Sequence, residues 1–248
     1  MEQGRLHWLL SRRVGAVEAV LSRSLGGARS PYDWLARSVS VTATRVLVLA
    51  CGAGGMLERL DRDGRLVVGL DWSASSIAEA GRRGRGVLVQ ADANYLPFAE
   101  ASFDAVVSDL GLAVNENREL MVAEAARVLR PGGMFAALTP SLRPMDFTDA
   151  KQMWWLTRLL RRMPQVPGET EFRVGELLRA AGLQKAEDAR ARFHFTVRNR
   201  ADAEVLLAGL RAVEDADRAQ QAVEQLARRA ERHEVRIPLP FRRILALR

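Results

Sequence analysis

Apolar and polar positions along the central part of the chain predict strands and helices in turn. Short runs with consecutive apolar positions are typical of strands that are covered on both faces. Helical stretches lie between these runs, and this alternation favours an α/β fold, a doubly wound parallel sheet with helices on both faces. The predicted strands are Val46–Leu49, Leu66–Leu70, Val87–Val89, Ala105–Val107 and Met134–Leu138, and the predicted helices are Gly55–Leu60, Ser73–Arg83 and Arg118–Leu129.

The segments outside this central part are predicted to be mainly helical. Leucine and valine recur at helical spacing over residues 4–25, and a second helix follows over Tyr32–Val39, so residues 1–44 form an N-terminal helical extension. Prolines interrupt the rhythm in residues 141–172, which contain an apolar helix. The remaining predictions are a helix at Val174–Ala181, a half-buried strand at Phe193–Val197, a helical stretch at Ala203–Glu234 with a break near Glu214, and a last apolar run at Ile244–Leu247 after Pro238 and Pro240.

The composition is that of a soluble globular protein. The 248 residues are 48% hydrophobic and 27% charged, which suffices for a core and excludes wholesale disorder. The single cysteine, Cys51, cannot form an internal disulfide, which argues against a disulfide-stapled secreted domain. The longest runs without a charge, Val46–Leu57 and Pro131–Leu142, are shorter than the roughly 18 residues of a membrane span. Arginines interrupt every candidate signal-peptide core, so we expect a cytoplasmic protein.

The formal net charge of +7 is distributed unevenly. Residues 1–45 hold 7 basic and 3 acidic residues, residues 46–140 hold 9 and 12, and residues 141–248 hold 21 and 15. A mildly acidic centre therefore lies between basic flanks. Only Lys151 and Lys185 are lysines, and such a preference for arginine indicates a compositional bias of the genome more than a particular partner.

Candidate binding residues follow three of the predicted strands. The first strand runs into the glycine-rich turn 50–54, and glycine lets a ligand approach the backbone closely. Asp71 ends the second strand, where a carboxylate can bind the hydroxyl pair of a ribose, and Asp92 follows the third. Because open α/β sheets bind ligands at the carboxyl ends of their strands, these groups are expected to face one crevice.

Over about residues 45–185 the chain resembles the class I S-adenosylmethionine-dependent methyltransferases. The resemblance rests on VLVLACGAGG at 46–55, VVGLDWS at 67–73, QADANYLPFAEASFDAVVS at 90–108 and EAARVLRPGG at 124–133, with a weaker match in ELLRAAGL at 176–183. It implies a seven-stranded, mostly parallel Rossmann-like sheet with an antiparallel last strand. A nicotinamide-binding domain fits less well, because its third small residue would fall at Leu57 and RVLRPGG would be unexplained.

The resemblance also implies S-adenosyl-L-methionine as the cofactor and gives residues their roles. The backbones of Ala50, Gly52 and Gly54 would line its methionine part. Asp71 would bind the ribose, and Trp72 would pack on the adenine, unless it is only a half-buried core aromatic. Asp92 would reach the adenine amine, supported by the Ala93 amide, and Ser108 would lie near the sulfonium and the acceptor, whereas Asp104 would be structural.

For the flanking segments, the resemblance implies that residues 1–44 cover the active site of a domain spanning 45–248. The insertion 141–172 would build the acceptor pocket, with Trp154 and Trp155 either in its wall or in helix packing. We expect no metal ion and assign no catalytic residue. Cys51 is interpreted as a small buried apolar residue. A surface or structural role is favoured for the histidines His7, His194 and His233, while Tyr32, Tyr95 and Asp109 are further candidate bases, and Arg158, Arg161 and Arg162 form either a solvated face or a contact to an anionic acceptor.

Two positions depart from the pattern of the family. Most members carry an acidic residue where this chain has Val48, and glycine where it has Ala50. The acidic residue helps to orient the amino group of the methionine end, and the loss of one charge-assisted hydrogen bond weakens binding by roughly 1.5–3 kcal/mol. The methyl group of Ala50 adds bulk to a crowded turn.

The sequence therefore predicts methyl transfer to an oxygen, nitrogen or carbon nucleophile of a small, fairly apolar acceptor molecule. The nucleophile would displace the sulfonium in line, and proximity and desolvation would supply most of the acceleration, so a side-chain base is optional. Two alternatives stay open. The basic flanks would suit an RNA methyltransferase, although no appendage with interleaved basic and aromatic residues is present. Val48 and Ala50 would suit a non-catalytic binding protein on the same frame. The oligomeric state is not predicted.

Overall fold

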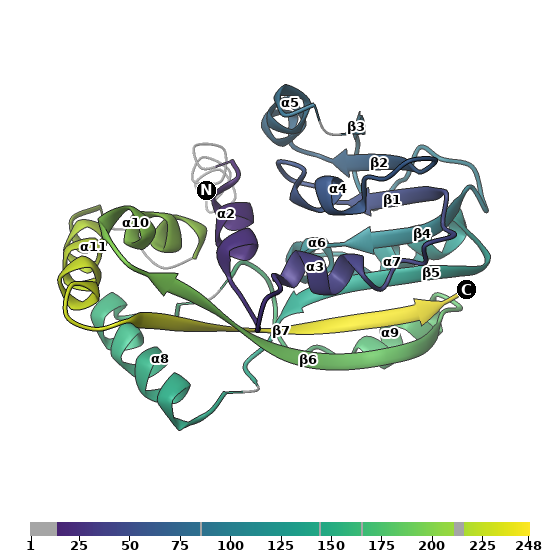
Figure 1. The fold of residues 1–248 in the computed structure, drawn as a ribbon. Helices are drawn as coiled ribbons and strands as arrows, with labels where there is room; N and C mark the ends of the chain where they lie inside the picture. The colour runs from purple at the N-terminus through teal and green to yellow at the C-terminus, as the bar shows by residue number, and fades with distance from the viewer. Residues whose placement is uncertain (1–13, 85, 144, 165, 211–215) are drawn as a thin grey trace.

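One mixed sheet forms the centre of the molecule (Figure 1). The computed structural model describes residues 14–84, 86–143, 145–164, 166–210 and 216–248. Within them, seven strands follow the order β3-β2-β1-β4-β5-β7-β6, in which β1 to β5 pair in parallel and β7 is antiparallel to both of its neighbours. The predicted fold class is confirmed. The strands are β1 (Arg45–Leu49), β2 (Leu66–Asp71), β3 (Val87–Gln90), β4 (Phe103–Ser108), β5 (Leu129–Pro140), β6 (Gln184–Val197) and β7 (Val235–Leu247).

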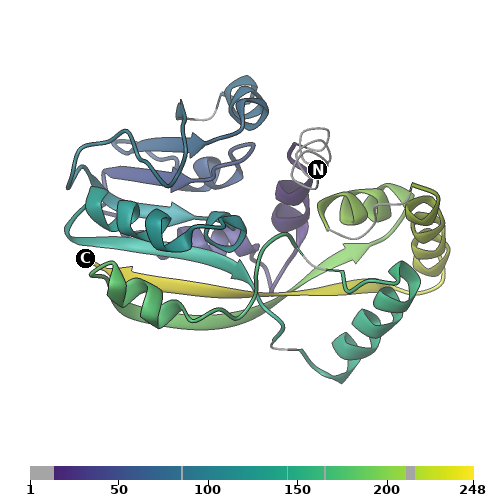
Figure 2. The same ribbon diagram turned by 180° about the vertical axis from the view of Figure 1, so that it is seen from behind.

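Short helices cover both faces of the parallel part of the sheet (Figures 1 and 2). Helices α3 (Pro31–Ala36), α4 (Gly55–Leu60) and α5 (Ala74–Arg82) pack on one face, and α6 (Gly111–Val114), α7 (Arg118–Val128) and α9 (Val174–Ala180) on the other. Local capping explains several starts: Ser30 and Asp33 form a capping box at α3, and the Ser73 hydroxyl accepts from the Ser76 amide at α5. Helices α4, α5 and α6 thus begin a few residues after the carboxyl ends of β1, β2 and β4.

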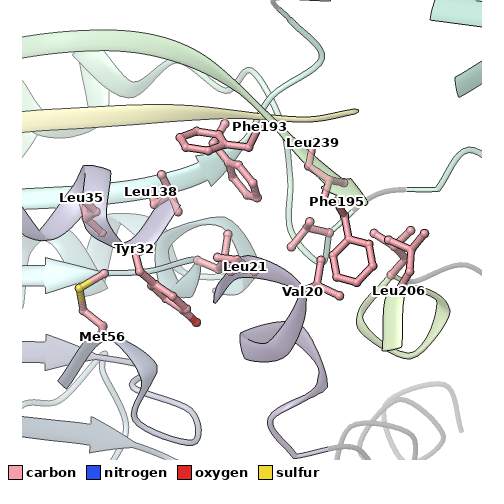
Figure 3. Packing of buried hydrophobic residues seen from close by; sticks show 14 of the residues in the cluster. Val20, Leu21, Tyr32, Leu35, Met56, Leu138, Phe193, Phe195, Leu206 and Leu239 are labelled. Carbon is pink, nitrogen blue, oxygen red and sulfur yellow. The ribbon is translucent and has the colours of Figure 1, made fainter. Parts of the chain in front are cut away.

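The two last strands extend beyond the rest of the sheet and carry a second group of helices (Figure 1). These are α2 (Ala16–Arg23), α8 (Phe147–Leu160), α10 (Arg200–Gly209) and α11 (Ala216–Ala230). Their apolar side chains belong to the same core cluster as Phe195 and Ile237 of the extended hairpin. In Figure 3, Val20 of α2 lies beside Phe195 of β6 and Leu206 of α10. The N-terminal helix is therefore packed against C-terminal parts of the chain.

Strands β6 and β7 are much longer than predicted. The first half of β6 is rich in charged residues, and these pair with arginines of β7: Asp188 with Arg242 and Glu187 with Arg243. Ion pairs therefore replace the apolar alternation that would have indicated a strand. Pro238 and Pro240 lie inside β7, where it pairs with β6 but not with β5, so the ladder tolerates residues that cannot donate a hydrogen bond.

The helix predictions at the two ends of the chain differ from the structure mainly in their bounds. The helix predicted over 4–25 is described only as α2, which ends at Arg23, because residues 1–13 lie outside the described residues. The stretch predicted over Ala203–Glu234 is two helices, since Leu210 leaves α10 in an extended conformation; the predicted break near Glu214 lies outside the described residues. Among the described residues we find no helix whose length and apolar content would let it cross a membrane.

Candidate functional site

A cavity of about 230 Å³ opens at the carboxyl ends of β1, β2 and β4. The turns that follow these strands form its floor, and α2 and α3 form one of its walls. Of the described part of segment 141–172, only Pro167 reaches it. The lining residues are Val14, Gly15, Val17, Glu18, Tyr32, Ala50, Cys51, Gly52, Ala53, Asp71, Trp72, Ser73, Ser76, Asp109, Leu110, Gly111, Val114 and Pro167.

The turn between β1 and α4 is built from residues with positive φ angles. Ala50 has φ 54°, Gly52 has φ 55° and Gly54 has φ 89°. A Cβ atom added at Gly52 would meet no atom within 4 Å, so this stretch of backbone stays open to the cavity. The methyl group of Ala50 is accommodated because Gly111 has no side chain: a Cβ there would lie 2.7 Å from the Ala50 Cβ. The alanine thus depends on a glycine in the facing turn.

Asp71 ties two of the turns together. Its Oδ2 accepts a hydrogen bond from the Gly52 amide at 2.9 Å, and its Oδ1 accepts one from the Ser73 amide at 2.9 Å. The side chain is buried, and burial raises the pKa of its carboxyl, while the two amide hydrogen bonds act in the opposite direction. A carboxylate is therefore fixed at the tip of β2, where the sequence predicts ribose binding.

The structure brings Ala50, Gly52, Asp71 and Trp72 together in the wall of the cavity, and Trp72 is 60% exposed. Gly54 is the N-cap residue of α4. Gly54 and the other three predicted residues are not among those that line the cavity. Asp92 is exposed and accepts from the Asn94 amide, Ala93 packs against the second core cluster, and the fully buried Ser108 accepts from the Leu112 amide at 2.9 Å.

A buried acidic group that the sequence leaves as one of several candidates lies next to Ser108. Asp109 lines the cavity, is 8% exposed, and forms a hydrogen bond with the Tyr32 hydroxyl. Burial raises the pKa of Asp109 well above its usual range, and the negative charges of Glu18 and Asp71 act in the same direction. Burial also raises the pKa of Tyr32 strongly, followed by the charge of Asp109. Both groups therefore favour their neutral forms.

Glu18 is a lining residue that the sequence analysis missed. Its Oε1 accepts from Arg83 Nη1 at 2.9 Å, which links α2 to the end of α5. A Cβ added at Gly55 would lie 2.7 Å from the Glu18 Cγ, so α2 lies directly on the start of α4. In the sequence, Glu18 is one glutamate on a predicted amphipathic helix, and such a residue is normally solvent-exposed, so nothing marks it as a cavity residue.

The remaining candidates lie away from the cavity or are inert. Burial raises the pKa of the Cys51 thiol, in agreement with its interpretation as a small apolar residue. His194 bonds Asp149 at 2.8 Å, and Asp104 accepts from the Thr44 and Arg45 amides, as expected of structural residues. His7 lies outside the described residues. Trp154 is exposed and Trp155 contacts Arg229; Tyr95, Arg158, Arg161, Arg162 and His233 are also absent from the cavity lining.

Comparison with known proteins places the chain in a family. A family model described as a methyltransferase domain matches residues 47–137. The malonyl-[acyl-carrier protein] O-methyltransferase of Enterobacter lignolyticus is 34% identical over 154 residues, 62% of this chain and 58% of that protein. The demethylmenaquinone methyltransferase of Parafrankia sp. is 30% identical over 182 residues, 63% of this chain and 68% of that protein. The chain spans roughly half to two thirds of the length of these curated relatives.

Solved structures share the fold at low sequence identity. The [4+2]-cyclase SpnF has a TM-score of 0.63 and 20% identity, with 99% of this chain and 95% of that chain covered. A Haemonchus contortus N-methyltransferase in complex with phosphomonomethylethanolamine and S-adenosylhomocysteine has a TM-score of 0.58 and 15% identity, with 97% and 59% covered. The sheet order and the crevice at its carboxyl edge define a methyltransferase-type α/β protein. The chain belongs to the class I S-adenosylmethionine-dependent methyltransferase family.

Proposed function

We propose that the protein transfers a methyl group from S-adenosyl-L-methionine to an oxygen, nitrogen or carbon nucleophile of a small, largely apolar molecule. The observation that carries the proposal is the cavity at the carboxyl edge of the sheet, where the open backbone of Gly52 and the carboxylate of Asp71 meet. The space next to Gly52, and an Asp109 Oδ1 that has no hydrogen-bond partner in the described part of the chain, suit a ligand with polar and positively charged groups.

The residues around the cavity would share the binding of the cofactor. Asp71 would bind the ribose hydroxyls, for which its two amide hydrogen bonds already hold the carboxylate in place. The exposed Trp72 would pack on the adenine, with Asp92 and Ala93 just after the end of the neighbouring strand β3. When bound, the cofactor supplies an electrophilic methyl group on a positively charged sulfur. The protein then has to position the acceptor and exclude water, and α2 is well placed to do so.

An apolar acceptor is supported by the lining and by the relatives. Val14, Val17, Leu110, Val114 and Pro167 give the cavity apolar walls near the acidic groups. Named relatives act on demethylmenaquinone or fatty acids, which are molecules with large apolar parts. Segment 141–172 was expected to build the acceptor pocket, yet only Pro167 of its described residues lines the main cavity, and others line a separate, much smaller cavity together with Pro238, Leu239 and Pro240. We therefore assign the acceptor to the main cavity, beneath α2.

Calorimetry with S-adenosylmethionine tests the cofactor, and transfer of a labelled methyl group tests the acceptor class. We expect binding that is weakened at least tenfold in Asp71→Ala, because the substitution removes the ribose contact, and label in the solvent-extractable fraction of a cell extract. The exposed Asp63→Asn is the matched control and should bind like the wild type. Absence of binding at millimolar cofactor would refute the proposal. Binding without transfer to any fraction would favour a non-catalytic binding protein.

One observation favours a second candidate, an RNA methyltransferase. An open groove between α8 and α11 is lined by Trp155, Arg228, Arg229, Arg232 and His233, which combines an aromatic ring with basic groups. It is separate from the cavity at the strand ends, since the two share no lining residue. RNA binding that persists at 200 mM salt, together with label in the RNA fraction, would support this candidate, because purely electrostatic attraction weakens steeply with salt.

A further inference from the structure

Among the described residues, the lining of the cavity holds three carboxyl groups and no basic counterpart. Glu18, Asp71 and Asp109 line it from three different elements, α2, β2 and the turn after β4. No arginine, lysine or histidine is among the lining residues of the part of the chain that the structure describes. Negative groups that face one cavity repel each other, so the arrangement favours a ligand that brings positive charge.

The three carboxyl groups differ in how their charge is compensated. Asp71 accepts hydrogen bonds from two backbone amides, and Glu18 pairs with Arg83. Asp109 has the Tyr32 hydroxyl, but its Oδ1 is buried without a hydrogen-bond partner among the described residues. Buried carboxyl oxygens are normally paired, because an unpaired one loses its hydration without gaining a substitute. Asp109 is therefore the group at which a positively charged ligand atom would gain most.

Asp109 also offers a carboxyl group in place of the acidic residue that most family members carry at the position of Val48. Val48 is fully buried in β1, and its side chain belongs to the same apolar cluster as Tyr32 and Leu110. A valine there supplies neither charge nor hydrogen bond to the methionine end of the cofactor. Asp109 follows β4, the strand paired with β1, and its side chain lines the cavity, whereas Val48 is not among the lining residues. One buried carboxyl group is lost and another is present.

We propose that Asp109, held by Tyr32, binds a positively charged centre of S-adenosylmethionine, either the methionyl ammonium or the sulfonium, and so replaces the carboxylate that is missing at Val48. The inference rests on the proposed function. Glu18 adds negative charge from α2, and the ribose is assigned to a different residue, Asp71.

Three related ligands distinguish the contributions of the ammonium, the sulfonium and the uncharged remainder of the cofactor to binding. S-adenosylmethionine carries both the ammonium and the sulfonium, S-adenosylhomocysteine carries only the ammonium, and 5′-methylthioadenosine carries neither. Dissociation constants are measured by calorimetry for the wild type and for Asp109→Asn, which keeps the size of the side chain. Asp71→Asn should weaken all three ligands, because each contains the ribose, and the exposed Asp63→Asn controls for a change of net charge.

We expect Asp109→Asn to weaken S-adenosylmethionine about ten- to hundredfold and to leave 5′-methylthioadenosine within twofold of the wild type. If Asp109→Asn also binds S-adenosylhomocysteine more weakly than the wild type does, the contact is to the ammonium. If the affinity for S-adenosylhomocysteine is unchanged, the contact is to the sulfonium. Equal weakening of all three ligands, or of none, would overturn the inference, because Asp109 would then only shape the cavity or take no part. If the wild type binds none of the three, the proposed function fails first, and the inference fails with it.

Discussion

The position of α2 over the cavity depends on the missing side chain of Gly209. A Cβ atom at this last residue of α10 would lie 2.5 Å from Val20 Cγ2 and 2.8 Å from the main-chain oxygen of Ala16, both on α2. Ordinary contacts between carbon atoms are about 3.5–4.0 Å long. A methyl group at Gly209 therefore overlaps a helix that carries Val17 and Glu18 into the cavity wall.

The expected effect of Gly209→Ala is a loss of about 1–2 kcal/mol of unfolding free energy. Overpacking of this kind costs about 1–3 kcal/mol, since the main-chain oxygen of Ala16 cannot rotate away as a side chain can. The better helix propensity of alanine returns at most about 1 kcal/mol. Gly175 in α9 is the matched control, because a Cβ there meets nothing within 4 Å and Gly175→Ala should keep or slightly raise stability.

Equilibrium urea unfolding measures both variants, and calorimetry then measures the affinity of Gly209→Ala for S-adenosylmethionine. We expect a lower urea midpoint with an unchanged slope, and severalfold weaker cofactor binding because α2 is displaced from the wall. The reasoning would be refuted if Gly209→Ala were as stable as Gly175→Ala. Lost stability with unchanged affinity would show that α2 does not contribute to cofactor binding.

Three further predictions concern titratable groups. Burial raises the pKa of Asp109 in the folded protein, so the free energy of unfolding of the wild type decreases as pH rises above about 4, where the unfolded chain ionises this group and the folded protein resists doing so. Asparagine does not ionise, so the stability of Asp109→Asn relative to the wild type should increase between pH 5 and pH 8 in urea unfolding. A constant difference would contradict this. Hydrogen bonds from Arg190 and Ser141 lower the pKa of the Glu171 carboxyl to about 2. Glu171→Gln should therefore lower the free energy of unfolding by about 1–2 kcal/mol near pH 7, and this loss should shrink as pH falls below about 4.5. An equal loss at pH 4 and pH 7 would refute the prediction. The buried Cys51 thiol should react with a disulfide reagent at pH 8 only as fast as the protein opens, and a rate equal to that of the denatured chain would show that it is accessible.

The parallel half of the fold was predictable because its strands are covered on both faces. Burial on both faces leaves continuous apolar runs, such as Val46–Leu49, and these runs were located within one or two residues in four of the five strands. The β6–β7 hairpin was not predictable in the same way. Its first half is stabilised by ion pairs such as Asp188 with Arg242. The two residues are 54 positions apart, so no periodic pattern within a short stretch of sequence indicates that they pair.

The residues of the candidate site likewise fall into a group that the sequence predicts and a group that it does not. Gly52 and Asp71 follow predicted strands directly, so the topology of the sheet brings them together without further information. Glu18 and Asp109 reach the cavity from elements whose relative position depends on tertiary packing. No local pattern distinguishes Glu18 from an exposed helical glutamate. Asp109 becomes informative only when it is known to be buried, with one oxygen that has no hydrogen-bond partner among the described residues.

The docking of α2 has a consequence for synthesis of the chain. Arg23 at the end of α2 pairs with Asp202 of α10, which follows 179 residues later. At the usual rate of translation, the N-terminal helix waits about 10–40 s for this partner. During that interval the apolar side of α2, with Val20 and Leu21, lacks the cover that α10 and β6 later provide, and it is a surface on which a chaperone could act. The wall of the cavity that comes first in the sequence is thus among the last to be completed on the ribosome.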